Sequence, residues 1–257
     1  MVSIISEIKA KKELSDIPDD IVKLTLSDYL TKHKIIIPEN QKAKKFIIKS
    51  IRAELRRYAG QYSLSSKSKK DKLIKSKDFK ELLKHHSSTK ERINDYPLLI
   101  DIIQKLKPKS ILDLGCGINP LAIAQKGIFY HAYDIKNEDL EIVSAFFKEN
   151  SLSGDVHHAD IRNISKFPDT DLCLILKVLD ILGNNKIELS KKFLTEIQAK
   201  TFIISFATKT LSGIPMNRPY RRWFEKILIE LNLKYKVVRT SQELFYIISK
   251  EKIIKII

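Results

Sequence analysis

The residues with the clearest chemical potential form a glycine turn within residues 111–120. A short apolar run that contains Asp113 leads into Gly115-Cys116-Gly117. Glycines let backbone N–H groups approach a ligand where a side chain would collide, and Pro120 suits the first turn of a helix. We therefore expect a ligand on this turn, with Asp113, Gly115 and Gly117 among the residues that bind it.

Two carboxylates follow at the ends of the next apolar runs. Asp134 lies 17 residues after Gly117, where it can accept hydrogen bonds from two ribose hydroxyls, and Asp160 can accept one from an adenine amino group. Ile135 and Ile161 belong to the same expected site. Turn chemistry is the alternative role for these carboxylates. It is less favoured, because open α/β sheets bind ligands at the carboxyl ends of their strands.

This combination favours S-adenosylmethionine over NAD. A dinucleotide fingerprint needs a third glycine or an alanine where this chain has Pro120. A turn with one ribose acid and one adenine acid predicts methyl transfer. Since the sulfonium already activates the methyl group, the main task of such a protein is to position the nucleophile.

The second part of the chain predicts the sheet that must position these residues. Short apolar runs alternate with helical stretches, which indicates a parallel, Rossmann-like α/β sheet whose last two strands form an antiparallel edge. The expected strands are Ser110–Leu114, Phe129–Asp134, Asp155–His158, Leu172–Leu176, Thr201–Phe206, Tyr235–Thr240 and Leu244–Ser249.

The first part of the chain predicts helices. Apolar residues recur at helical spacing before residue 60, and a polar basic stretch at 63–70 precedes a third amphipathic segment. We expect two domains: an all-helical extension and linker over residues 1–95, and a methyltransferase domain over residues 96–257.

The charge distribution indicates a polyanionic partner. The chain has 47 basic and 31 acidic residues, a net charge of +16, and residues 1–110 alone hold 26 basic and 14 acidic residues. A concentrated positive field attracts nucleic acid. A lysine-rich composition throughout is the alternative explanation. The candidate RNA contacts in this part are Arg52, Arg56, Arg57, Lys69 and Lys70.

Composition excludes several other classes of protein. Of the 257 residues, 43% are hydrophobic and 30% charged, which is typical of a folded globular chain. No apolar run approaches the roughly 20 residues that span a bilayer, so we expect a cytoplasmic protein without a membrane partner. Cys116 and Cys173 are too few for a disulfide framework, and no metal site is expected. We interpret His85 and His86 as linker residues.

Several segments together resemble the aminoglycoside-resistance 16S ribosomal RNA methyltransferases that modify N7 of a guanine in the decoding site. The resemblance covers most of the chain after about residue 20. It rests on residues 56–62, 86–92, 113–122, 131–135, 174–179 and 205–211.

The resemblance implies a methyltransferase fold with S-adenosylmethionine as cofactor and 16S rRNA in the 30S subunit as partner. It also implies a helical extension that docks on rRNA, and Arg92 as the residue that holds the cofactor's carboxylate. Antibiotic resistance is a further implied role. We expect a monomer.

The chain departs from the family pattern near the expected target-base pocket. Where the family continues Lys-x-Leu-Pro-x-Leu-Glu, this chain has Asp180 and Gly183 in the proline and glutamate positions. It has Ala207 in place of a proline, and a shorter loop before Tyr220.

Lys177 follows the fourth expected strand and is the candidate catalytic residue. Guanine N7 carries a lone pair, so no general base is needed, and Lys177 would orient the target through base or phosphate oxygens. A surface ion pair with Asp180 is the alternative role for this lysine.

A loop near residue 220 mixes cations and aromatics, which suits RNA backbone and stacked bases. Its candidate RNA contacts are Lys209, Arg218, Tyr220, Arg221 and Arg222. We expect Tyr220 to stack on a base, whereas Trp223 and Phe224 are expected to pack into the core.

Other functions stay open from sequence alone. The target can be a neighbouring adenine N1 or a tRNA base, because adenine N1 also carries a lone pair. A non-catalytic RNA-binding assembly factor is a second class, and an NAD oxidoreductase is the least favoured.

Overall fold

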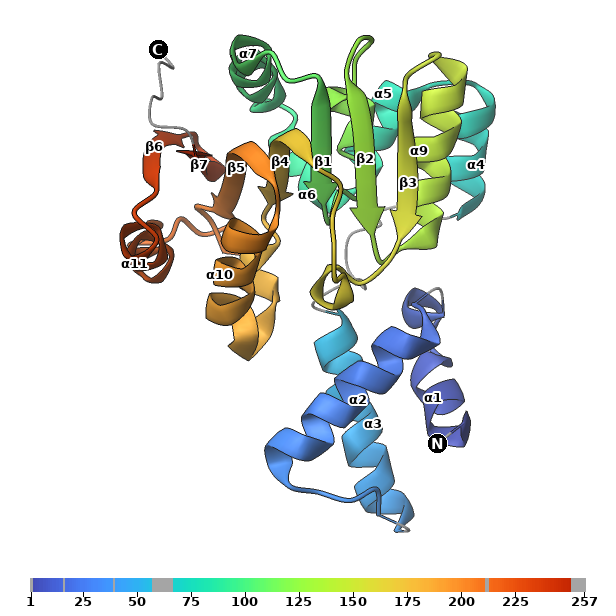
Figure 1. Cartoon of the computed structure of the whole chain (residues 1–257). Coiled ribbons are helices and arrows are strands. Elements are labelled where there is room, and N and C mark those ends of the chain that lie inside the picture. Colours follow the sequence, from blue (N-terminus) through green and yellow to red (C-terminus); the bar gives the residue numbers. More distant parts are fainter. Residues whose placement is uncertain (1, 16, 39, 57–66, 211–212, 251–257) are drawn as a thin grey trace.

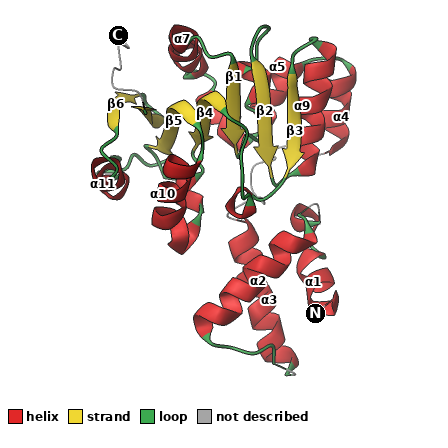
Figure 2. Cartoon of the chain, viewed as in Figure 1, coloured by secondary structure: helices red, strands yellow, loops and turns green. Residues whose placement is uncertain are grey.

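The computed structural model describes residues 2–15, 17–38, 40–56, 67–210 and 213–250. A single twisted sheet with helices on both faces occupies the second part of the chain, and a group of helices lies below its lower edge in the view of Figure 1. Figure 2 shows the same separation between a purely helical part and a mixed part.

The seven strands have the order β3-β2-β1-β4-β5-β7-β6. The first five are parallel to one another, and β7 runs antiparallel to both β5 and β6. The strands are β1 (Ser110–Leu114), β2 (Phe129–Asp134), β3 (Gly154–His158), β4 (Thr170–Leu176), β5 (Ala199–Ala207), β6 (Lys234–Arg239) and β7 (Glu243–Ser249). The predicted Rossmann-like sheet is confirmed, and every expected strand is present within two residues of its expected bounds.

Burial explains why these runs became strands. The central strands β4 and β7 are buried along almost their whole length, so apolar residues predominate on both of their faces. The edge strand β6 is only partly buried and alternates with lysine and arginine, as suits an edge exposed to water.

The helices that accompany the sheet either precede β1 in the chain or connect later strands. They are α4 (Lys67–Lys75), α5 (Phe79–Leu82), α6 (Ser87–Arg92), α7 (Tyr96–Leu106), α8 (Pro120–Ile123), α9 (Asn137–Glu149), α10 (Lys186–Glu196) and α11 (Arg222–Glu230). Pro120 occupies the first turn of α8, as the sequence predicts.

The N-terminal helices have a hydrophobic core of their own. They are α1 (Val2–Lys9), α2 (Asp19–His33) and α3 (Gln41–Leu55), and the Asn40 side chain caps α3 by accepting from the N–H groups of Lys42 and Ala43. Ile8 and Ile51 are fully buried within this core, which ends along the chain at Leu55.

The segment that follows residues 57–66 packs into the core of the sheet instead. Phe79, Leu82 and Leu83 are buried together with residues of β1, β2 and α9. The helical extension and linker of residues 1–95 are therefore built on two different cores, and a domain boundary at residue 95 stays a prediction. Arg57 lies outside the described residues.

Candidate functional site at the carboxyl edge of the sheet

A cavity of about 740 Å³ lies where the parallel strands end. The arrowheads of β1, β2 and β3 in Figure 1 point toward this edge and toward the N-terminal helices. Ala53 and Arg56 of the α3 region contribute to the cavity lining. The predicted residues that line it are Arg56, Gly115, Gly117, Asp134, Ile135, Asp160, Ile161, Lys177, Lys209 and Arg221.

The glycine turn has the backbone conformation that requires glycine. Gly115 and Gly117 have φ values of +71° and +49°. A Cβ atom on Gly115 would lie 2.6 Å from Cγ2 of Val178, and one on Gly117 would lie 3.2 Å from Cε1 of His86. The two glycines thus allow the turn to lie close to Val178 and His86. The Gly115 and Cys116 N–H groups both donate to the Tyr133 carbonyl, at 2.8 and 3.0 Å, which fixes the turn against β2.

Asp134 is fixed beside this turn by backbone donors. Its Oδ2 accepts from the Gly117 N–H at 2.8 Å, and its Oδ1 accepts from the Lys136 N–H at 2.9 Å. Burial raises the pKa of the Asp134 carboxyl. Each carboxylate oxygen has a second acceptor site, so this side chain can still accept from hydroxyl groups in the cavity.

Asp160 reaches the same cavity, but it is not a free acceptor. Its carboxylate accepts from the Arg162 guanidinium, with Oδ2 to Nη2 at 2.6 Å, and from the Arg162 backbone N–H at 2.9 Å. The sequence did not indicate this pairing, which leaves the remaining acceptor sites of Asp160 to face the cavity.

Two predicted cofactor ligands lie behind the turn rather than on the cavity lining. Arg92 is fully buried, and its guanidinium donates to Glu243 at 2.7 Å and to Asn119 at 2.6 Å. Burial alone would lower the pKa of Arg92, but the Glu243 carboxylate outweighs it and raises that pKa. The structure therefore places Arg92 in an internal ion pair, and its role toward a cofactor stays a prediction.

Asp113 is likewise buried. Its Oδ2 accepts from the Tyr130 hydroxyl at 2.7 Å, whereas Oδ1 has no hydrogen-bond partner among the described residues. Burial raises the pKa of Asp113 to about 7. Asp113 therefore joins β1 to β2 inside the protein. Direct contact between Asp113 and a cofactor stays a prediction.

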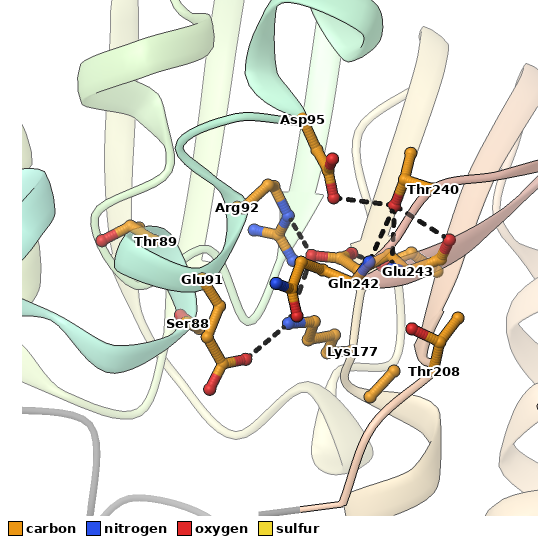
Figure 3. Close-up of polar contacts among 12 residues, drawn as sticks. Ser88, Thr89, Glu91, Arg92, Asp95, Lys177, Thr208, Thr240, Gln242 and Glu243 are labelled. Atoms are coloured by element: carbon orange, nitrogen blue, oxygen red, sulfur yellow. Dashed lines mark hydrogen bonds and ion pairs between the residues drawn. The ribbon is translucent and has the colours of Figure 1, made fainter. Parts of the chain in front are cut away.

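Lys177 lies at the centre of a charged cluster (Figure 3). Its Nζ is 2.8 Å from Oε2 of Glu91 and 3.3 Å from Oε1 of Glu243. The residue adopts φ +62°, which turns the chain directly after β4 and sends the side chain toward the cavity. The alternative ion pair with Asp180 is wrong, because Asp180 binds Arg221.

Glu243 is a functional candidate that the sequence did not reveal. It is fully buried at the start of β7 and binds Arg92, Lys177 and the Ser205 hydroxyl, the last at 2.6 Å. Burial would raise the pKa of Glu243, but Arg92 and Lys177 outweigh it and lower that pKa. It lies 151 residues from Arg92, so no local pattern could predict the pair.

A second buried cluster adjoins the cavity near the glycine turn. Asp139 in α9 lies 3.5 Å from Nε2 of His86 and 3.7 Å from Nζ of Lys70. Burial would raise the pKa of Asp139, but His86, Lys136 and Lys70 together outweigh it and lower that pKa. His86 therefore belongs to the site itself rather than to a simple linker.

This cluster corrects the prediction for Lys70. The Lys70 side chain is only 4% exposed and faces Glu138 and Asp139, so it does not present its charge to RNA phosphates. Lys69 beside it is exposed and keeps the predicted role.

The other candidate RNA contacts divide by exposure. Arg218, Tyr220 and Arg222 are exposed near α11, and Tyr220 retains 47% of its surface. In the N-terminal helices, Arg52 donates to the carbonyl groups of Glu7 and Ile8, and Arg56 donates to Glu13 at 2.7 Å. Arg52 and Arg56 therefore bind other parts of the N-terminal helical region, and each remains partly exposed.

The structure also corrects the prediction that Arg221 contacts RNA. Its side chain is 12% exposed and pairs with Asp180 at 2.8 Å, so it stabilises the loop rather than offering a charge to RNA. Phe224 is fully buried, and Trp223 packs beside it and Phe206, which confirms the predicted core packing of both.

A group that could bind a metal ion lies at the sheet edge, where none was expected. Oδ1 of Asp155 is 2.8 Å from Nδ1 of His131 and 2.9 Å from Nε2 of His157. Asp155 forms a hydrogen bond with His131, whereas Nε2 of His157 lies within ion-pair distance of the same oxygen but has no hydrogen-bond partner among the described residues. Among the described residues, no helix has the length and apolar character to cross a membrane.

Comparison with known proteins identifies relatives over most of the chain. The 16S rRNA (guanine(1405)-N(7))-methyltransferase of Serratia marcescens is 27% identical over 252 residues, which is 96% of this chain and 97% of that protein. The structure of the 16S rRNA methylase ArmA is 30% identical with a TM-score of 0.57, and the match covers 70% of this chain and 96% of ArmA.

A further solved structure has the same fold over the whole chain. The 16S rRNA methyltransferase RmtF, in complex with S-adenosyl-L-homocysteine, has a TM-score of 0.79 and 21% identity, and the match covers 97% of each chain. A family model described as ribosomal RNA methyltransferase (FmrO) matches residues 71–247. Because that match spans more than half of the chain and includes both the glycine turn and the charged cluster, the protein belongs to the ribosomal RNA methyltransferase (FmrO) family.

Proposed function

We propose that this protein transfers a methyl group from S-adenosylmethionine to N7 of a guanine in the decoding site of 16S rRNA. The target would be the guanine that the name of the Serratia marcescens relative numbers 1405. The observation that carries the proposal is one cavity that holds the glycine turn, Asp134 and Lys177 together.

The residues present fit the cofactor. A Cβ atom at Gly115 or Gly117 would crowd the turn, so the glycines let a ligand approach the backbone closely. Their own N–H groups bind within the protein, since Gly115 donates to the Tyr133 carbonyl at 2.8 Å and Gly117 donates to Asp134 at 2.8 Å. Asp134 can accept from ribose hydroxyls, and Ile135 and Ile161 provide apolar contacts for an adenine between them and Asp160. When bound, S-adenosylmethionine supplies a methyl group that its sulfonium has already activated.

Arg92 is a candidate for the cofactor's carboxylate on the family resemblance. In this chain the guanidinium is committed to Glu243 and Asn119. That role therefore requires Asn119 or Glu243 to be exchanged for the carboxylate.

The chemistry at guanine N7 explains why the cavity needs no general base. N7 carries an in-plane lone pair, so forming the N7–methyl bond removes no proton from the base. Positive charge moves onto the purine, and the carboxylates around Lys177 stabilise it while Lys177 itself holds a base or phosphate oxygen. The protein mainly clamps a flipped base in line with the methyl group.

The charge distribution supports the assembled 30S subunit as substrate. The exposed residues Lys69, Arg218 and Arg222 lie on separate elements, so together they suit the shape of a folded RNA better than one short strand. We propose a monomer that acts in the cytoplasm, where ribosomes are available. Methylation of a decoding-site guanine would confer aminoglycoside resistance.

The test is methyl transfer from tritiated S-adenosylmethionine to purified 30S subunits, free 16S rRNA and tRNA. We expect incorporation into 30S subunits alone, and chain cleavage at one guanine after borohydride and aniline treatment. Transfer to tRNA, or a mark on an adenine, would replace the proposed target. No transfer to any RNA, with cofactor still bound, would indicate a binding protein instead.

A further inference from the structure

The positions where this chain departs from its family are joined by one side chain. Arg221 donates from Nη2 to Oδ2 of Asp180 at 2.8 Å and to the carbonyl oxygen of Ala207 at 3.1 Å. Asp180 and Ala207 are two of the positions where the family has proline. The loop after β4, the end of β5 and the loop before α11 are therefore connected at the cavity.

Arg221 is held so firmly that it orients its partners. The guanidinium lies 5.4 Å from the centre of the Phe206 ring, donates to the Pro219 carbonyl, and belongs to a side chain that is 12% exposed. Because an arginine keeps its charge at all ordinary pH values, the Asp180 carboxylate always faces a cation.

Arg221 does not occupy all the hydrogen-bond acceptor sites of the Asp180 carboxylate. Oδ2 accepts from Nη2 at 2.8 Å and from Nε at 3.0 Å, whereas Oδ1 has one longer contact, 3.3 Å from Nε. Asp180 lines the cavity and its side chain is 33% exposed. Oδ1 therefore has acceptor capacity left for a ligand in the cavity.

The other carboxylates of the cavity have different commitments. Glu91 pairs with Lys177, and Asp139 faces His86 and Lys70. Asp134 and Asp160 lie by the glycine turn and after the end of β3. Gly183, where the family has glutamate, offers no side chain at all. Asp180 differs from Glu91, whose side chain is 54% exposed, because two nitrogen atoms of the nearly buried Arg221 hold its carboxylate in place.

Of the two purines, guanine is the one whose N1 and N2 positions both offer donors to a carboxylate. When N7 faces the methyl group, the N1–H and the N2 amino group lie on the opposite side of the base, and both are donors. Adenine presents an acceptor at N1, which a carboxylate would repel. A fixed carboxylate opposite the methyl donor therefore selects guanine.

We propose that Asp180, oriented by Arg221, accepts hydrogen bonds from the N1–H and N2 amino groups of the target base and so determines the preference for guanine. This inference rests on the proposed function. It assigns to Asp180 a role in base specificity.

The test compares target bases in 30S subunits assembled in vitro with 16S rRNA that carries guanine or inosine at the mapped position. Inosine keeps N7 and N1–H but lacks the N2 amino group. We expect kcat/KM of the wild-type protein to fall about 10- to 100-fold on inosine, because one carboxylate contact loses its donor. In Asp180→Asn and Asp180→Ala, guanine and inosine particles should be methylated at nearly equal, lower rates.

Two controls separate specificity from folding. Affinity for S-adenosylhomocysteine and the unfolding temperature report whether each Asp180 variant is intact. Asp169→Asn, a matched change at an exposed position outside the cavity lining, should keep the wild-type discrimination.

The outcomes distinguish this inference from the proposed function. Equal losses on guanine and inosine in the Asp180 variants, with the wild-type ratio retained, would overturn the specificity role and leave methyl transfer intact. A wild-type protein that methylates neither particle would remove the proposed function, and this inference with it. Arg221→Lys, which loosens the carboxylate but keeps the charge, should give an intermediate inosine ratio.

Discussion

Arg92 and Glu243 form an ion pair in which both side chains are fully buried, with Nε and Oε1 2.7 Å apart. The pair joins α6 to the first residue of β7, and Lys177 and Ser205 bind the same carboxylate. Figure 3 shows this arrangement, with Thr240 bound to Asp95 beside it. The catalytic edge of the sheet is therefore held by a charge network instead of apolar contacts alone.

Replacing one member of this pair should destabilise the protein strongly. Glu243→Gln leaves the Arg92 charge buried without its counter-ion, which costs about 3 to 5 kcal/mol. Urea unfolding measures the loss. Glu149→Gln, at an exposed ion pair with Lys77, should change the free energy of unfolding by less than about 1 kcal/mol. Similar small losses in both variants would contradict the assigned role of the buried pair.

The raised pKa of Asp113 predicts a particular pH dependence of stability. Its folded-state pKa is about 7, whereas an unfolded aspartate titrates near 3.9. Between these values the unfolded chain releases the proton and the folded chain keeps it, so this group lowers stability as pH rises and has no further effect above about 7.

Asp113→Asn removes that titration while keeping an acceptor for Tyr130. The stability of the variant relative to wild type should increase by about 2 to 3 kcal/mol between pH 5 and pH 8. Denaturant curves at several pH values measure it, with the exposed Asp169→Asn as reference. Parallel curves for Asp113→Asn and wild type would show that the carboxyl titrates normally.

Alanine at Gly115 should affect both stability and cofactor affinity. Its φ of +71° strains any side chain, and the new Cβ would lie 2.6 Å from Val178, which together cost about 2 to 4 kcal/mol. Gly127→Ala is a matched control, because Gly127 has φ +83° and no atom within 4 Å of the added Cβ. Calorimetry should show S-adenosylhomocysteine affinity at least about 10-fold weaker in Gly115→Ala only.

Arg222 should contribute to RNA affinity through charge. Removing one phosphate contact in Arg222→Gln should weaken 30S binding a few-fold and reduce the slope of log affinity against log salt by about 1. Lys126→Gln changes an exposed lysine near the amino end of β2 and should leave the slope unchanged. Filter binding over a range of salt concentrations measures both, and equal slopes for the two variants would reject the contact.

Lys70 should behave in the opposite way from an RNA contact. Lys70→Met removes a cation that faces Asp139 and Glu138 in the interior, which should cost about 3 kcal/mol of stability. The salt dependence of 30S binding should match wild type after correction for folding. A reduced slope with unchanged stability would restore the surface role for this lysine.

The sequence predicted those elements that depend on residues close together in the chain. β1 and β4 are short runs in which apolar residues dominate, and Gly115 and Gly117 stand where φ is positive. The sheet and its turn could therefore be recognised before any tertiary contact was known. Asp134 followed from its place at the end of β2.

What could not be predicted depends on pairs far apart along the chain. Lys70 belongs to a lysine-rich run typical of a solvated helix face, and only the fold brings Asp139 against it. Arg221 looked like its exposed neighbours until Asp180, 41 residues earlier, accounted for its charge. A charged residue in isolation does not reveal whether its counter-ion lies in solvent, on RNA or across the core.

The wall that Ala53 and Arg56 contribute to the cavity has a consequence for timing. Under the proposed function, the N-terminal helices would bind rRNA and also form part of the cavity that receives the base. Binding of the RNA and completion of the cavity would then occur together, and a variant without these helices would lose both the RNA contact and part of the cavity wall.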